Sequence, residues 1–142
     1  MCIRDSYIVN TGDKKCRCGR YGCLETEVSS RAIINDAGGN MTLEDIVNSN
    51  DKNIIYMLDH KIDLVALALV NTATILNADS IVLFGLLFEN ERIIEKLVKQ
   101  CVRYNKNFNE SIIKISSLNK KREYIGCIAM CAKKYFFEIG FD

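Results

Sequence analysis

The chain has 142 residues, of which 49% are hydrophobic, so it can bury one core of ordinary domain size. Its 19 basic and 18 acidic residues give a net charge of +1, which excludes an overall field that attracts nucleic acid or an anionic membrane. The most apolar run, residues 62–78, is interrupted by polar side chains and falls short of the roughly 20 clean apolar residues that a bilayer span needs. The N-terminus lacks the apolar stretch of a signal peptide. We therefore predict one domain without a transmembrane segment.

The first predicted elements are a strand at residues 7–9 and a turn at residues 10–13, from their strand-like and turn-like compositions. Together they lead the chain into residues 16–25, with the sequence CRCGRYGCLE. Three of the seven cysteines fall within eight residues of this stretch. We expect it to organise the rest of the chain.

The cysteine spacing predicts a zinc loop. Thiolates this close can all face one point, and Zn²⁺, with Zn–S bonds of about 2.3 Å, is the ion most often found there. Gly19 and Gly22 fit this interpretation, because a backbone that folds around an ion needs residues that accept positive φ. The expected ligands are Cys16, Cys18 and Cys23.

Free thiols in a turn and a disulfide are the two alternatives to zinc. A bridge between Cys16 and Cys18 would be short and strained. The cysteines outside the loop show no paired framework, which favours a reducing cytoplasm: Cys2, Cys101, Cys127 and Cys131. Basic side chains also crowd residues 14–20, but a nucleic-acid-binding zinc ribbon would need a second CxxC-type pair.

Two helices are expected after the loop. Apolar residues at positions 24, 28, 32 and 33 predict a helix that starts after Cys23 and ends at the glycine pair 38–39. Thr42 is the expected N-cap of a short second helix with carboxylates in its first turn, which ends near Asn48.

The longest predicted helix begins at Asp51 and ends near Leu76, with apolar residues spaced by three and four. Its apolar face widens toward the C-terminal half, which indicates packing against a sheet and other helices. The lone histidine, His60, lies in this helix, and we interpret it as a surface residue and not a zinc ligand.

The last part of the chain predicts a βαβ unit followed by a helix. Residues 80–85 are a short apolar run that ends in Gly85, typical of a parallel strand buried on both faces. A helix over residues 89–104, a second strand over 112–116 and a final helix over 122–137 follow. A right-handed crossover is expected between the two strands.

The loop sequence Cys-x-Cys-Gly-x-x-Gly-Cys-Leu-Glu, followed by Ser29 and Ser30, resembles the zinc motif of ROK proteins. The resemblance continues through residues 81–85 and 124–126 and covers everything after about residue 7. This family joins bacterial sugar kinases with sugar-sensing transcriptional repressors. The resemblance implies an α/β fold, namely an actin-like and ribonuclease H-like ATPase-type lobe that is truncated at its N-terminus. Within this lobe, residues 7–142, the zinc loop would occupy residues 10–25, and helices and a βαβ core would occupy residues 26–142.

The resemblance also implies roles for particular residues. Zinc would be held by the three loop cysteines, and the histidine that supplies the fourth ligand in the family falls at about Ser6, so this ligand is expected to be missing. Residues 1–6 have no counterpart in the family and are interpreted as a non-native leader. Glu25 matches the glutamate that accepts hydrogen bonds from sugar hydroxyls. Its alternative role is a surface carboxylate at a helix N-terminus.

The function implied by the resemblance is the C-terminal lobe of a sugar-responsive repressor. The phosphate-binding loop and catalytic aspartate of the family belong to the first half, so no catalysis is expected from this chain alone. Kinases build the turn after the first strand from two or three glycines, whereas here Phe84 and Leu86 flank Gly85 and would obstruct adenosine.

The alternative is a fragment of a glucokinase- or fructokinase-type sugar kinase, and a third possibility is a small zinc-dependent interaction module. The expected partners are a small sugar, DNA only through a missing N-terminal domain, and further copies of the full-length protein.

Overall fold

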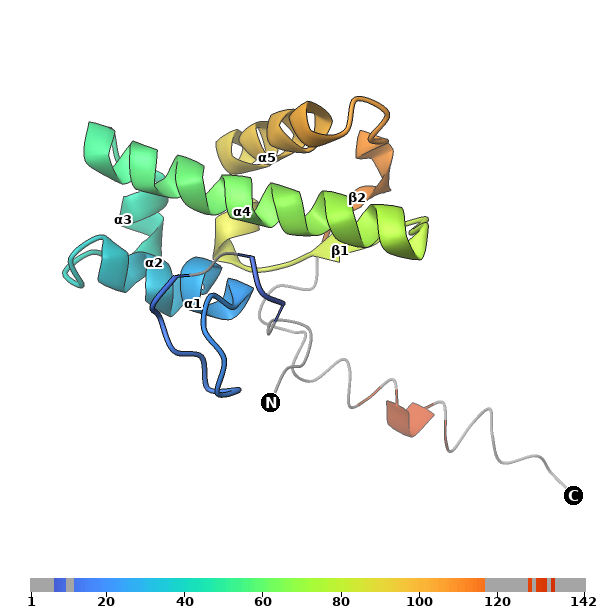
Figure 1. Ribbon diagram of the computed structural model, residues 1–142, viewed down its shortest axis with the longest axis horizontal. Coiled ribbons are helices and arrows are strands. Elements are labelled where there is room, and N and C mark those ends of the chain that lie inside the picture. The colour runs from blue at the N-terminus through green and yellow to red at the C-terminus, as the bar shows by residue number, and fades with distance from the viewer. Residues whose placement is uncertain (1–6, 10–11, 117–127, 129, 133, 135–142) are drawn as a thin grey trace, which may run out of the picture.

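The computed structural model describes residues 7–9, 12–116, 128, 130–132 and 134 (Figure 1). Its named elements are, in chain order, α1 (Leu24–Val28), α2 (Ser30–Asp36), α3 (Leu43–Val47), α4 (Lys52–Leu76), β1 (Ile81–Leu83), the 3₁₀ helix η2 (Leu86–Glu89), α5 (Glu91–Tyr104), the 3₁₀ helix η3 (Glu110–Ile112) and β2 (Ile113–Ile115). The chain is thus a mixed α/β unit, as the sequence predicts.

Helix α4 is the long element around which the others are arranged, with α5 along one side and α1 to α3 on the other (Figure 1). The side chain of Asp51 caps α4 by accepting hydrogen bonds from the backbone N–H groups of Asn53 and Ile54, which confirms the predicted start. The helix ends at Asn77, in the left-handed conformation that often closes helices. The apolar core lies between α4 and α5 and extends to α2, α3, β1 and η2. Its members on α4 and α5 include Leu58, Ile62, Val65, Ala66, Ile93, Leu97 and Cys101.

The short helix α3 has the N-terminus that the sequence predicts. The hydroxyl of Thr42 accepts a hydrogen bond from the Asp45 N–H at 3.2 Å, and the Asp45 carboxylate accepts one from the Thr42 N–H at 3.2 Å. This capping box satisfies two backbone donors that a helix N-terminus otherwise leaves unpaired. The apolar residues of α3 then join the core.

The two strands pair in parallel across the intervening α5, with Ile81 opposite Ile113 and Leu83 opposite Ile115. The order strand, helix, strand is therefore confirmed. The expectation that the first strand is buried on both faces is wrong, because the side chain of Val82 is 61% exposed. Within the described residues the sheet has only these two strands, and one of its faces stays open.

Two predicted helices differ from the structure. The helix expected after Cys23 is broken at Ser29, whose extended backbone ends α1 and whose hydroxyl caps α2 by accepting from Ala32 N–H at 3.3 Å. The helix expected from residue 89 begins instead at Glu91, because η2 occupies the preceding residues.

The burial of α4 widens in its C-terminal half, as predicted, but only as far as Val70. Its buried side chains lie between Leu58 and Val70, whereas Ile75 and Leu76 in the last turn are exposed.

Of the predicted helix 122–137, the structure describes residues 128, 130–132 and 134, of which 128 and 130–132 are helical, and the rest lies outside the described residues. Across the described helices, none combines the length and apolar character required to cross a bilayer.

Candidate functional site

The cysteine loop, residues 12–23, is shaped by backbone hydrogen bonds and two glycines. Lys15 and Tyr21 form an antiparallel bridge, and the Cys16 N–H donates to the Arg20 carbonyl at 2.8 Å. Gly19 and Gly22 have φ angles of 92° and 68°, a region that residues with a Cβ rarely adopt. Both glycines therefore have the role predicted for them, which is to turn the backbone sharply inside the loop.

The predicted strand at residues 7–9 also pairs with this loop. Ile8 forms an antiparallel bridge with Cys23, and the Leu24 N–H donates to the Tyr7 carbonyl at 2.8 Å. The last cysteine is thereby fixed between an extended segment on one side and the start of α1 on the other.

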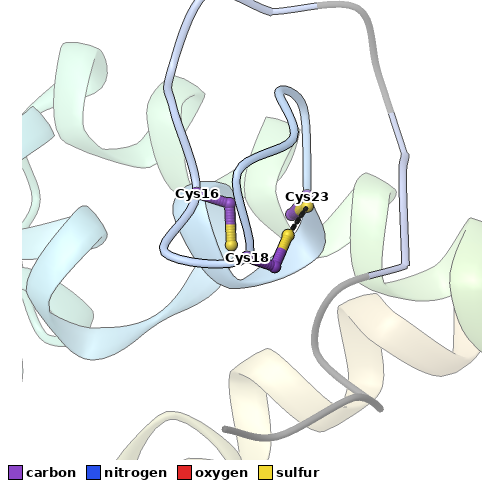
Figure 2. A group of neighbouring side chains, drawn as sticks. All are labelled: Cys16, Cys18 and Cys23. Carbon is purple, nitrogen blue, oxygen red and sulfur yellow. Dashed lines mark hydrogen bonds between the residues drawn. The ribbon is translucent and has the colours of Figure 1, made fainter.

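The sulfur atoms of Cys16, Cys18 and Cys23 all lie within 4.8 Å of one another, and those of Cys18 and Cys23 are 3.6 Å apart (Figure 2). Bonds of about 2.3 Å to a tetrahedral Zn²⁺ place two thiolates roughly 3.8 Å apart. The three donors thus have the chemistry and the separations that a zinc ion requires. None of the cysteines in the described part of the chain is in a disulfide, so that alternative is not supported.

Neighbouring groups favour charge on one of these thiols. Backbone and side-chain hydrogen bonds from Arg20 lower the pKa of Cys18 to about 6, whereas burial raises the pKa of Cys23 to about 11. The thiolate is the form that binds metals, so Cys18 presents a ready anionic donor at neutral pH. A divalent cation would offset the desolvation that keeps Cys23 protonated. The position expected for a fourth ligand, near Ser6, lies outside the described residues.

Glu25 lies beside the cysteines, in the first turn of α1. Its Oε2 accepts a hydrogen bond from the Cys16 thiol, with 3.8 Å between the oxygen and the sulfur. The same side chain lines an open cleft of about 270 Å³, whose other walls include Lys15, Arg17 and Arg31. A carboxylate at the edge of such a cleft can accept hydrogen bonds from hydroxyl groups of a small polar molecule.

An ion network that was not predicted from the sequence lies next to this site, and two of its members, Lys14 and Asp36, line the same cleft as Glu25. It consists of Lys14 in the cysteine loop, Glu27 of α1, Asp36 at the end of α2 and Lys61 of α4. The Lys61 Nζ is 2.9 Å from Glu27 Oε2 and 2.5 Å from Asp36 Oδ2, and the Lys14 Nζ is 3.3 Å and 2.7 Å from the same atoms. Each cation thus contacts both anions.

The network is buried at its centre, where Lys61 is 3% exposed and Glu27 is 6% exposed. Burial opposes ionisation of Glu27 and Asp36, but hydrogen bonds and charge from the two lysines outweigh it, so the pKa of each carboxyl is lowered. One signal in the sequence could have revealed the network. Lys61 lies three residues after Leu58 and four before Val65, so it falls within the apolar stripe of α4, where a lysine needs an anionic partner.

The remaining predicted positions lie apart from the cysteines. His60 is exposed on α4 and is not among the residues that could hold a metal in the described part of the chain. Gly85 has φ 117° and forms the turn between β1 and η2, as expected. The side chains of Phe84 and Leu86 on either side of it are both largely exposed.

Comparison with known proteins places this arrangement in a family. A profile of the ROK family matches residues 7–134. Among solved structures, the ROK hexokinase from Thermus thermophilus is similar over 87% of this chain and 46% of its own, with a TM-score of 0.75 and 19% identity. A ROK family transcriptional regulator, a homolog of the E. coli MLC protein, is similar over 78% of this chain and 33% of its own, with a TM-score of 0.63 and 21% identity.

A comparison with curated protein sequences found no match. This chain spans less than half the length of either solved protein, and at these identities the similarity is one of fold. The family match, in contrast, extends from before the cysteine loop to beyond the second strand. The chain belongs to the ROK family.

Proposed function

We propose that this chain is the C-terminal, sugar-binding lobe of a sugar-responsive transcriptional repressor with an actin-like fold. A zinc ion held by Cys16, Cys18 and Cys23 would fix the loop, and Glu25 would accept hydrogen bonds from sugar hydroxyls. One observation carries this proposal: the Glu25 carboxylate lies 3.8 Å from the Cys16 sulfur and at the edge of an open cleft. A metal bound to the loop would therefore restrain the backbone from which the ligand-binding carboxylate projects.

Metal content is the first test of this proposal. We expect the chain to bind zinc through three thiolates, more weakly than a complete four-ligand site, with an open fourth position. Elemental analysis of the purified protein measures the stoichiometry. A value near zero that does not change when Cys18 is replaced by serine would refute the zinc assignment.

The second test separates the role of Glu25 from that of the cysteines. In the complete protein, Glu25→Gln should weaken binding of D-glucose or D-fructose by about 10- to 100-fold, because a hydrogen bond to a charged group contributes about 1.5–3 kcal/mol. Its zinc content and thermal stability should stay at the wild-type values. Unchanged sugar affinity in this variant would leave Glu25 only the role of a carboxylate at a helix N-terminus.

Cys23→Ser is the matched variant and should behave differently. Loss of a metal ligand should lower zinc affinity by more than the roughly 10- to 100-fold that removal of an outer hydrogen-bond partner costs. Sugar affinity and thermal stability should fall together, because the metal orders the loop. A Cys23→Ser protein with full zinc content would contradict the assignment of this ligand.

The turn after β1 supports the choice of repressor over kinase. A single glycine forms this turn, and the exposed side chains of Phe84 and Leu86 on either side of it would obstruct the approach of an adenosine to the backbone. We expect the complete protein to bind ATP poorly in a calorimetric titration. Micromolar ATP affinity would reverse the choice.

A sugar kinase lobe is the second candidate, and the similarity to the Thermus thermophilus hexokinase over 87% of this chain favours it. The coding sequence upstream of Tyr7 discriminates between the two. A winged helix-turn-helix there indicates a repressor that contacts DNA through that domain, and a phosphate loop of the Asp-x-Gly type without it indicates a kinase. Either complete protein is expected to be a homo-oligomer in the cytoplasm.

A further inference from the structure

The ion network joins four segments of the chain at one point. Lys14 comes from the cysteine loop, Glu27 from α1, Asp36 from α2 and Lys61 from α4, and all four cation–anion pairs are 3.3 Å or closer. Two positive and two negative charges cancel, so the group can be buried without an unpaired ion. Removal of any one member leaves the other three with an unbalanced charge.

Helix α1 contributes its one buried side chain to this network. All five of its residues are described, and Glu27 is the single one whose side chain is buried. A helix of this length is not stable by itself, so its orientation must come from tertiary contacts. At its buried side α1 contacts α4 through the ion pair between Glu27 and Lys61, and the neighbouring Val28 packs against the apolar core.

The same helix carries Glu25, two residues before Glu27. Successive helical residues are rotated by about 100°, so these two side chains project about 200° apart, on opposite sides of α1. Glu27 points inward to Lys61, and Glu25 therefore points outward to the cleft that it lines. The ion pair of Glu27 therefore restrains the rotation of α1 about its axis, and with it the direction of the Glu25 carboxylate.

Lys14 extends the same restraint to the cysteine loop. It lies two residues before Cys16, and its ammonium group contacts both Glu27 and Asp36. The next residue, Lys15, forms the bridge with Tyr21 that closes the loop. The loop, α1 and α2 thus share one set of charges with the rigid core helix α4.

We propose that Lys61 is a positioning residue for the ligand site: through Glu27 it fixes the rotation of α1 and so aims Glu25 at the cleft. This inference rests on the proposed sugar-binding role of Glu25. Without the Lys61 ammonium, Glu27 and Asp36 keep only Lys14, whose side chain is partly exposed. The Glu27 carboxylate is then drawn outward to water, and α1 turns with it.

Lys61→Met in the complete protein is the direct test, because methionine keeps most of the length of the unbranched side chain and removes its charge. Calorimetric titration with D-glucose and D-fructose should show affinity at least about 10-fold lower than wild type, at a temperature where circular dichroism shows the variant fully folded. Lys96→Met is the matched control, since it removes an ion pair with Asp59 that does not involve α1. Its sugar affinity should equal that of wild type.

A second measurement does not depend on sugar. In the Lys61→Met variant of this chain, amide hydrogen exchange should become faster in residues 24–28, whereas the amides of α5 keep their protection. If wild-type protein binds neither sugar, the proposed function fails and this exchange measurement alone decides the role of Lys61. Unchanged exchange in α1 overturns the inference whatever the sugar affinity is.

The milder variant Glu27→Gln decides the question if Lys61→Met does not fold. Glutamine has the shape of glutamate and can still accept a hydrogen bond from Lys61, but it lacks the charge. Faster α1 exchange with weaker sugar binding in this folded variant supports the positioning role. A variant that is less stable, yet binds sugar as wild type does once folded, shows that the network contributes stability alone.

Discussion

The helix pair α4 and α5 and the cysteine loop with α1 are held by different forces. The buried contacts between α4 and α5 are apolar, and residues such as Ile62 and Leu97 are almost completely buried. In the loop and α1, the close contacts are backbone hydrogen bonds, thiols and the ion network. The first region depends on excluding water from hydrocarbon, and the second on keeping each polar group paired with a partner.

This difference predicts different responses to mutation and to solution conditions. Apolar packing is lost in proportion to the volume that is removed and depends little on pH. When one member of a buried ion pair is removed or neutralised, the whole stabilising interaction is lost, because the other charge stays buried without a partner of opposite charge. The region that carries the candidate ligand site is therefore the one that proton and metal concentrations can disturb, while the core beneath it is unaffected.

The largest effect is expected from a core substitution in α5. Leu97→Ala should lower the free energy of unfolding by about 2–5 kcal/mol, because Leu97 is fully buried and the truncation leaves a cavity. Urea denaturation measures the change. Val102→Ala in the same helix is the control, and since Val102 is exposed its effect should be within about 0.5 kcal/mol. Equal effects of the two would contradict the description of α4 and α5 as an apolar core.

Acid should act on the loop region through the ion network. The pKa values of Glu27 and Asp36 are lowered in the folded state by the two lysines, so the unfolded chain binds protons first as the pH falls. Stability is therefore fully present above the ordinary carboxyl pKa values of 4.5 and 3.8 and is lost as the pH falls through the lower folded values. Each group contributes a slope of at most about 1.4 kcal/mol per pH unit.

Denaturation of metal-free protein between pH 3 and 5 measures this slope, with the cysteines protonated and no metal to compete. Glu27→Gln should reduce the slope by up to about 1.4 kcal/mol per pH unit, because one of the two depressed carboxyls no longer titrates. Leu97→Ala should lower stability at every pH without a change of slope. A Glu27→Gln protein with the wild-type slope would show that Glu27 does not titrate in that range.

The apolar half of the fold could be predicted from the sequence because its signals are local and periodic. The spacing of apolar residues gave α4, and the cap at Asp51 and the capping box at Thr42 gave helix starts that the structure confirms. The parallel pairing of β1 with β2 follows from the strand, helix, strand order. The break at Ser29 was not predicted, because Leu24, Val28 and Ala32 keep the helical spacing across it.

The candidate site could be predicted only in part. The three cysteines are close in sequence, so their meeting in space follows from spacing and two glycines. The ion network joins residues that are up to 47 positions apart, such as Lys14 and Lys61, and periodicity carries no information about such pairs. The one signal in the sequence is Lys61, a lysine within the apolar stripe of α4, which needs an anion from elsewhere in the chain.

Helix α3 tests a polar contact that is local in sequence. Thr42→Ala removes the hydroxyl that accepts from Asp45 N–H and should lower the free energy of unfolding by about 0.5–2 kcal/mol. The capping box shares no residue with the ion network. The slope of stability against pH that the network causes should therefore not change. Thermal denaturation at pH 7 and pH 4 measures both quantities. A Thr42→Ala protein as stable as wild type would show that the hydroxyl contributes nothing to the cap.

The smallest effect is expected from the other ion pair, between Lys96 of α5 and Asp59 of α4. Their charged atoms are 2.5 Å apart, closer than most contacts in the buried network, but both side chains are at least 40% exposed. Water and salt screen this pair, so Lys96→Met should change the free energy of unfolding by less than about 1 kcal/mol, and 1 M NaCl should remove the difference from wild type. The buried pair between Lys61 and Glu27 is longer, at 2.9 Å, yet its loss should be felt at any salt concentration. Urea denaturation of Lys96→Met and Glu27→Gln at low and high salt compares the two. If Lys96→Met is as destabilising as Glu27→Gln, and equally insensitive to salt, then burial is not what distinguishes the loop region from the surface of the core.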